Sequence, residues 1–192
     1  MDIWRKLTSK ASNPLHYVKN KIAAAASRKE TYTFEALPQN LDELKALPEA
    51  SLDDPFKTAA LALCALCVYA EDRKNGTEML NFLRGPRPMS PAEIAFLNDR
   101  FMDGKSYIPR SYFAGATPEN EYTPTKPYTV KVDSNQYSEL ENGNYMKLLL
   151  SSGGADSPRS VTLRKTGGGI WYLWEQNLLV DIRIPKSQDA WA

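Results

Sequence analysis

The residues whose types could do chemistry gather near the end of the chain, in the loop at 153–159 and the segments that follow it. This loop joins hydroxyl groups, a carboxylate and a guanidinium, which together can hold a carboxylate or phosphate ligand through charge-assisted hydrogen bonds. With the arginines and the tryptophan downstream they form one candidate ligand-binding set. Its members are Asp156, Ser157, Arg159, Arg164, Trp171 and Arg183.

This set has two interpretations. In the structural one, Asp156 pairs with an arginine and pins the loop to a sheet, while Arg164 stacks on Trp171. In the functional one, the arginines line a recess that holds a carboxylate or phosphate group. An enzyme of unfamiliar type that uses Asp156 and nearby arginines is a further alternative.

Familiar catalytic sets are missing from the sequence. A serine hydrolase needs a base beside its nucleophile, and the single histidine, His16, lies in a predicted amphipathic helix with no linked motif. No P-loop, dinucleotide fingerprint or nucleophile elbow is present. Asp156, Glu175 and Asp181 could supply paired carboxylates, but a two-carboxylate glycosidase also needs a deep cleft, which the sequence does not predict. We therefore assign no catalytic residue and expect no cofactor.

The two cysteines, Cys64 and Cys67, share one face of a predicted buried helix. Redox CxxC motifs usually begin a helix, where the dipole lowers the thiol pKa, whereas apolar surroundings raise it. We therefore expect structural cysteines. Zinc needs about four ligands, so no metal site is expected.

The apolar run at 59–70 is shorter than the roughly 18 residues that span a bilayer, and no transmembrane segment is expected.

Charge is balanced over the whole chain but uneven along it. The net charge of +1 makes nucleic acid an unexpected partner. Residues 1–30 carry seven Lys and Arg against two acids, and residues 31–54 carry six acids against one Lys. We interpret these segments as two solvated helix faces that attract each other. The alternative is an N-terminal arm that contacts a membrane or an acidic partner.

Residues that typically cap or end helices predict several helices over much of 41–104. The predicted helix starts are Asn13-Pro14, Asn40, Asp54-Pro55 and Ser90-Pro91. The central helix is expected to run from Asp54-Pro55 to about Lys74, where Asn75-Gly76 stops it. Prolines and tyrosines interleave over 107–127, which excludes a regular helix or central strand and predicts a connector packed over the body. A peptide-binding or stacking surface is the alternative for this connector.

The sheet is expected over 128–185. The predicted strands cover 128–132, 145–151, 160–165, 170–175 and 178–184. Glycines at 167–169 form the turn of a hairpin. If the hairpin closes symmetrically, Lys165 opposes Ile170, and one apolar face packs on the helices. That face holds Val161, Leu163, Ile170, Tyr172 and Trp174.

The fold class is therefore α+β, with a helical N-terminal half packed on one face of a curved, mostly antiparallel C-terminal sheet. We expect a basic amphipathic helical segment at 1–30 and a single domain at 31–192. The order of elements is similar to that of cystatin-like and nuclear-transport-factor-like folds, which host enzymes and binding modules alike.

Four segments carry a resemblance to a known family. They are YIPRSYFAGATPENEYTPTKPY at 107–128, SSGGADSPRSVTLRK, WYLWEQ and LLVDIRIP. Together they resemble an uncharacterised bacterial family, catalogued as a domain of unknown function, over about 41–185. The chain departs from that pattern at Gly153-Gly154, where the family has one glycine. The resemblance implies a soluble bacterial or phage-borne protein, with helices first and the sheet last, and transfers no catalytic residue.

From these observations we expect a cytoplasmic, non-enzymatic binding module for a protein partner or a small anionic ligand. The alternatives are the unfamiliar enzyme described above and an immunity or anti-defence helper protein. The sequence carries no signal for an oligomeric state.

Overall fold

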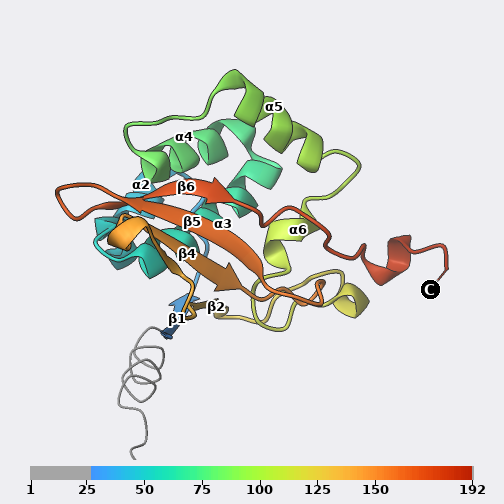
Figure 1. Cartoon of the computed structure of the whole chain (residues 1–192). Coiled ribbons are helices and arrows are strands. Elements are labelled where there is room, and N and C mark those ends of the chain that lie inside the picture. Colours follow the sequence, from blue (N-terminus) through green and yellow to red (C-terminus); the bar gives the residue numbers. More distant parts are fainter. Residues whose placement is uncertain (1–26, 192) are drawn as a thin grey trace, which may run out of the picture.

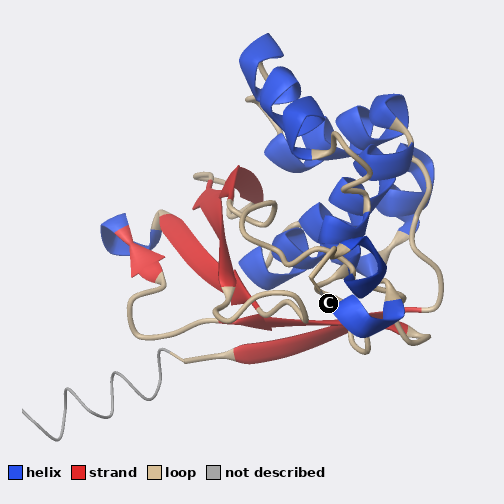
Figure 2. Cartoon of the chain, turned by 90° about the vertical axis from the view of Figure 1, so that its right-hand side faces the viewer, coloured by secondary structure: helices blue, strands red, loops and turns tan. Residues whose placement is uncertain are grey.

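The computed structural model describes residues 27–191 and has the expected α+β architecture (Figure 1). Helices dominate the first half of the chain, and a six-stranded antiparallel sheet dominates the second. Figure 2 shows the helices gathered to one side of the strands. Most of the helical segment expected at 1–30 lies outside the described residues.

The sheet follows the order β1-β2-β4-β5-β6, and every neighbouring pair is antiparallel. Its strands are β1 (Lys29–Phe34), β2 (Tyr128–Asp133), β4 (Tyr145–Leu150), β5 (Arg159–Lys165) and β6 (Trp171–Gln176), with the short β3 (Glu139–Leu140) paired to β4. The predicted strands at 128–132, 145–151, 160–165 and 170–175 are confirmed to within a residue or two.

Strand β1 corrects the interpretation of the N-terminal charges as helix faces. Residues 29–34 form an edge strand along β2, in a register that runs from Lys29 opposite Asp133 to Phe34 opposite Tyr128. The sequence KETYTF alternates polar and apolar residues with two threonines and two aromatics, which suits a half-buried strand.

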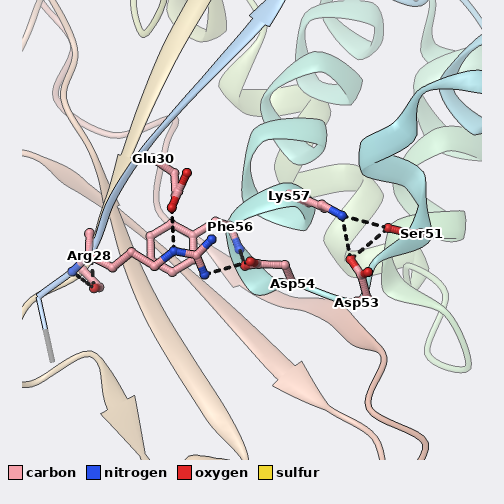
Figure 3. A network of polar contacts seen from close by, with 8 residues as sticks. Arg28, Glu30, Ser51, Asp53, Asp54, Phe56 and Lys57 are labelled. Carbon is pink, nitrogen blue, oxygen red and sulfur yellow. Dashed lines mark hydrogen bonds and ion pairs between the residues drawn. The ribbon is translucent and has the colours of Figure 1, made fainter. Parts of the chain in front are cut away.

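Arg28 joins the start of β1 to the start of helix α3 (Pro55–Glu71) (Figure 3). Its guanidinium lies 2.7 Å from Glu30 and 2.7 Å from Asp54, and it also lies over the ring of Phe56. Basic and acidic segments therefore do meet here, but they meet through a strand and a helix cap.

The helices are α2 (Leu41–Ala46), α3 (Pro55–Glu71), α4 (Arg73–Arg84), α5 (Pro91–Arg100) and α6 (Tyr107–Arg110). Short 3₁₀ turns occur at Pro48–Ser51, Pro118–Asn120, Glu141–Gly143 and Lys186–Gln188. Helix α3 is almost wholly buried and packs against the sheet, where it contacts β2, β4, β5 and β6. Among residues 27–191, no helix is long and apolar enough to cross a bilayer.

The predicted helix caps within the described chain are confirmed. The side chain of Asn40 accepts a hydrogen bond from the backbone N–H of Glu43 at 2.9 Å, and that of Asp54 accepts from Phe56 at 2.9 Å. Ser90 and Glu93 form a reciprocal capping box at the start of α5. Local sequence therefore sets these helix starts.

The predicted end of the central helix is wrong. Helix α3 ends at Glu71, and Asp72 caps a second helix, α4, by accepting from the N–H of Asn75 at 3.0 Å. Gly76 lies buried inside α4, where a Cβ atom would stand 2.3 Å from the Cα of Tyr69 in α3. This glycine therefore permits the close crossing of two helices and does not stop one.

The predicted register of the β5–β6 hairpin is also wrong, by one residue. Lys165 opposes Trp171 and Leu163 opposes Leu173, after which a β-bulge leaves Trp174 without a partner on β5. Trp171 and Leu173 are therefore buried with Leu163, whereas Tyr172 and Trp174 stay half-buried. A one-residue slip exchanges the two faces of a strand, so the apolar face was assigned to the wrong aromatics.

The segment at 178–184 is not a strand. Leu178 and Leu179 are both buried, which breaks the two-residue period that the alternation suggested. Side chains of the connector hold this segment instead. The hydroxyl of Tyr112 donates to the carbonyl of Leu178 at 2.7 Å, and the hydroxyl of Tyr122 donates to the carbonyl of Arg183 at 2.6 Å.

The connector at 107–127 buries four of its aromatic rings, so its packed character is confirmed.

Candidate functional site

Arg159 holds the loop at 153–159 to the segment at 178–184. Its Nε donates to the carbonyl of Val180 at 2.8 Å, its Nη2 to that of Asp181 at 2.9 Å, and its Nη1 to the carbonyl and hydroxyl of Ser157 at 2.8 and 3.0 Å. All three guanidinium nitrogens are therefore engaged in hydrogen bonds within the protein. These contacts support a structural role for Arg159 and Ser157.

Gly153 and Gly154, the two adjacent glycines of this loop, pack closely against the connector at 107–127. A Cβ on Gly153 would lie 2.0 Å from the carbonyl oxygen of Ala116, and one on Gly154 would lie 2.2 Å from the hydroxyl of Tyr122. The connector therefore leaves no space for a side chain at either position. This explains why the loop contains two glycines in succession.

Asp156 and Arg183 form an ion pair of 2.7 Å that stands in solvent, with side chains 91% and 55% exposed. An exposed pair of this kind contributes little to stability because solvent screens it. Asp156 pairs with an arginine, as the structural interpretation requires. None of Asp156, Ser157, Arg159 and Arg183 lines either groove described below.

Trp171 and Arg164 both lie on the β5–β6 hairpin, outside this loop. Arg164 opposes Tyr172, and Lys165 opposes Trp171, so Arg164 and Trp171 belong to opposite faces of the hairpin. Trp171 is buried against the start of α3, where its N–H donates to Leu52 at 2.8 Å and its carbonyl accepts from the hydroxyl of Thr58 at 3.0 Å. Arg164 is exposed, and its Cζ lies 4.7 Å from the centroid of the Trp174 ring. Arg164 therefore stacks on Trp174 and not on Trp171, which follows from the corrected register.

A groove that the sequence analysis did not identify lies between the end of α4 and the β5–β6 hairpin. Figure 1 shows the α4–α5 loop on the same side of the molecule as this hairpin. The groove has a volume of about 440 Å³, and its lining contains four cations and no carboxylate. We call it the arginine groove; its main residues are Arg84, Arg87, Arg164, Lys165, Tyr172 and Trp174.

Arg84 has a firmly held side chain in the lining of this groove, since it is buried and bonded to Glu93 and to the backbone of Arg87. It is the last residue of α4 and only 8% exposed. Its Nη2 lies 2.6 Å from Oε1 of Glu93, and its Nε donates to the carbonyl of Arg87 at 3.1 Å. The same Glu93 oxygen lies 3.3 Å from Nη2 of Arg87. One carboxylate therefore positions two guanidinium groups.

Glu93 is itself held by the capping box of α5. Its second carboxylate oxygen accepts from both the N–H and the hydroxyl of Ser90, at 2.8 Å each. Burial raises the pKa of this carboxyl, but the hydrogen bonds from Ser90 and the charge of Arg84 outweigh that effect, so the pKa of Glu93 is lowered. A helix-capping motif thus keeps the anchor of the two arginines ionised.

The β-bulge presents Trp174 to two of the cations. The Cζ atoms of Arg87 and Arg164 lie 4.5 and 4.7 Å from the centroid of its ring, and Tyr145 meets it edge-on at 5.6 Å. The contacts of Arg87 and Arg164 with this ring are cation–π interactions, which position a guanidinium group without neutralising its charge. Within 27–191, no carboxylate forms an ion pair with Arg164 or Lys165. The groove therefore keeps excess positive charge.

The comparison with known families agrees with the resemblance found in the sequence. Residues 36–186 match the family described as Domain of unknown function (DUF6935). The chain belongs to the DUF6935 family. No curated protein and no solved structure matches this DUF6935 chain.

A second groove of the DUF6935 domain adjoins the first. It has a volume of about 450 Å³ and shares Arg84, Arg87, Leu173 and Trp174 with the arginine groove. We call it the apolar groove; its apolar residues are Leu66, Leu80, Met89, Phe96, Leu97 and Leu173. The two grooves therefore meet at the two arginines that Glu93 positions.

The cysteines of the DUF6935 domain are free thiols buried in α3. Burial raises the pKa of Cys64, and it raises the pKa of Cys67 to about 12. Thiolates are the reactive form of cysteine, so neither side chain is suited to nucleophilic or redox chemistry at neutral pH. Across the described chain, no three His, Cys, Asp or Glu side chains gather in a way that could hold a metal ion.

The sequence did carry signals for the arginine groove. The break at 85–88 contains Arg87, and the capping box at Ser90 and Glu93 follows it directly. The sequence analysis interpreted Ser90-Pro91 as a helix start only. The acid that caps a helix has two carboxylate oxygens, and the second can hold an arginine from the preceding helix.

Proposed function

We propose that this DUF6935 domain is a binding module that holds a small anionic ligand, through its carboxylate or phosphate group, in the arginine groove. The observation that carries the proposal is Arg84, a buried guanidinium fixed by Glu93 in a groove that Arg87, Arg164 and Lys165 also line, the last two without a carboxylate partner among residues 27–191. A buried, fixed arginine loses little side-chain entropy when an anion binds, and its planar fork suits carboxylate and phosphate oxygens.

The size and chemistry of the groove support a small ligand. Small-molecule pockets measure roughly 300–1,000 Å³ and combine apolar walls with a few fixed polar groups. The arginine groove, at about 440 Å³, has Tyr172, Leu173 and Trp174 as walls and the cations as polar groups.

A binding role fits the groove better than catalysis. Of the groups that can act as a base or nucleophile, its lining includes Lys165, Thr166 and Tyr172 but no carboxylate, histidine or cysteine that would activate them. The enzyme alternative depends on Asp156, which is exposed and lies outside the groove. The hydrogen bonds of Arg159 to three backbone carbonyls also favour a structural function for that loop.

We further propose that the protein acts in the bacterial cytoplasm. The support is the family resemblance together with the two free thiols, since reducing compartments keep cysteines unpaired.

Calorimetric titration of the full chain with inorganic phosphate and with citrate tests the proposed function. Arg164→Gln removes an exposed cation of the groove, and Arg183→Gln removes an equally exposed arginine outside it. A charge-assisted hydrogen bond contributes about 1.5–3 kcal/mol, so we expect Arg164→Gln to raise the Kd about 10-fold or more.

The control Arg183→Gln should leave the Kd of both anions within about twofold of the wild-type value. Equal weakening by the two substitutions would mean that the anions respond to net charge and not to a site. Absence of saturable binding of either anion would contradict the proposal.

A further inference from the structure

We propose that the ligand is an amphiphilic anion, whose charged head occupies the arginine groove while an aliphatic chain lies in the adjoining apolar groove. This inference rests on the proposed function and adds the chemical class of the ligand. The two grooves share four lining residues and therefore lie side by side, within reach of a single molecule.

The floor of the apolar groove is built from buried side chains of three elements. Leu66 of α3, Leu80 of α4 and Leu173 of β6 are each less than 5% exposed and line the groove from below. These three side chains offer apolar contact, and Gln176 and Asn177 line the same groove with polar groups. An aliphatic chain that covers the apolar side chains is removed from water, which is favourable in proportion to the area buried.

Phe96 forms the open side of this groove. It lies on α5 and is 47% exposed, which makes it one of the large apolar side chains that the described chain leaves in water. Met89, in the loop before α5, is half-buried beside it. A chain laid between Phe96 and the floor would cover both side chains and remove this exposed apolar surface from water.

The charges of the two grooves fix the direction in which the ligand lies. The apolar groove has two cations, Arg84 and Arg87, and two carboxylates, Glu93 and Glu175, so its charges balance. The arginine groove adds Arg164 and Lys165 to these two arginines and has no carboxylate in its lining, so the excess positive charge lies on its side. An anionic head is therefore attracted to the arginine groove and repelled from the end of the apolar groove that Glu175 lines.

Trp174 and Arg87 lie at the boundary between the two grooves, where the charged head of the ligand would meet its aliphatic chain. The Arg87 guanidinium lies 4.5 Å from the Trp174 centroid, and both residues line both grooves. Arg87 carries a charge at its tip and methylene groups along its stem, so it can contact the head with one part and the chain with the other. The same pair of residues therefore suits a ligand with two chemically different ends.

Calorimetric titration of the full wild-type chain with acetate, hexanoate and octanoate tests the inference, with octyl phosphate and 1-octanol as further probes. A fully buried methylene contributes enough to tighten binding about fourfold, so we expect the Kd to fall about twofold to fourfold for each added methylene. Octanol, which lacks the charge, should bind at least about 10-fold more weakly than octanoate. The lower Kd of octanoate or octyl phosphate identifies the preferred head group.

Two substitutions separate the grooves. Phe96→Gln should abolish most of the gain from acetate to octanoate and leave the Kd of inorganic phosphate unchanged, and Met89→Gln should act in the same direction. The matched control is Met102→Gln, an apolar side chain that is 56% exposed and lies outside both grooves. It should change neither Kd. Circular dichroism confirms that each variant is folded.

The possible failures are distinguishable. If phosphate binds and Arg164→Gln weakens it, but octanoate binds no more tightly than acetate, the amphiphilic ligand is wrong and the proposed function stands. If octanoate binds tightly but Phe96→Gln and Met102→Gln weaken it equally, the chain does not lie in the apolar groove. If neither phosphate nor any carboxylate binds, both proposals fail.

Discussion

Replacement of Gly76 by alanine sets two known effects against each other. Glycine inside a helix is less favourable than alanine by about 1 kcal/mol, so local propensity alone makes Gly76→Ala stabilising. The packing of α4 on α3 has the opposite effect. The new Cβ would stand 2.3 Å from the Cα of Tyr69 and 2.5 Å from its N, whereas ordinary Cβ contacts begin at 3.4 Å.

The size of the stability loss depends on which atoms of Tyr69 the new Cβ atom would contact. The shortfall is about 1.1 Å, from 3.4 minus 2.3, and the atoms of Tyr69 are mainly backbone, so no side-chain rotation relieves the clash. Overpacking costs about 1–3 kcal/mol, and a clash with backbone belongs at the upper end. After the propensity gain of about 1 kcal/mol, we expect a net loss of about 2 kcal/mol.

Thermal unfolding followed by circular dichroism measures this loss. For a domain of this size, about 2 kcal/mol corresponds to a fall in Tm of roughly 4–8 °C. The matched control is Lys74→Ala, an exposed site on the same helix, which should shift stability by less than about 0.5 kcal/mol. A Gly76→Ala variant as stable as the wild type, or more stable, would refute the close crossing of α3 and α4.

Three further outcomes are expected. The pKa of Glu93 is lowered in the folded state, so its ionised form adds stability above its unfolded pKa of about 4.3, and this is lost as pH falls through the folded pKa. Glu93→Gln should therefore be less stable at pH 7 but lose less stability on acidification, and parallel acid-unfolding curves would contradict this. Cys64, which is 0% exposed, should react with a thiol reagent at the rate of global unfolding, and fast labelling of Cys64 in the native protein would disprove its burial. Arg159→Gln should lower stability by about 1–3 kcal/mol and leave phosphate binding intact, the reverse of Arg164→Gln, as denaturant titration and calorimetry together can establish.

Helix starts were predictable from the sequence because capping is local. The acceptor at Asn40, Asp54 or Ser90 lies within three residues of the N–H that it satisfies, so both partners are visible in a short window. The end of α3 was not predictable in this way. Gly76 resembles a helix stop in sequence, and its role depends on Tyr69 of the neighbouring helix.

The strand pairings illustrate the limit of local patterns. Strand β1 pairs with β2 about 100 residues later, so nothing near residues 29–34 indicates the partner. The β5–β6 hairpin packs on the end of α4, where a Cβ on Gly85 would lie 2.4 Å from the ring of Tyr172. Its turn places Lys165 opposite Trp171, one residue away from a symmetric closure, and for this reason the sequence pattern assigned Tyr172 and Trp174 to the buried face.

The candidate site was found in part. Arg164 was named from the sequence and lies in the arginine groove, but with Trp174 in place of Trp171. Arg84 was not named, because its burial and its contact with Glu93 arise from the packing of α4 against α5 and β6. The capping box that supplies Glu93 is visible in the sequence, but which arginine Glu93 holds is set by tertiary packing.

Nuclear magnetic resonance of arginine side chains tests anion binding in this groove most directly. As phosphate is added to the full chain, we expect the Nε–H signals of Arg84, Arg87 and Arg164 to shift along one saturable curve. The signal of Arg183, which is exposed and paired with Asp156, should remain in place. Small, linear shifts shared by all four arginines would mean that phosphate only screens surface charge, and the arginine groove would then not be a binding site.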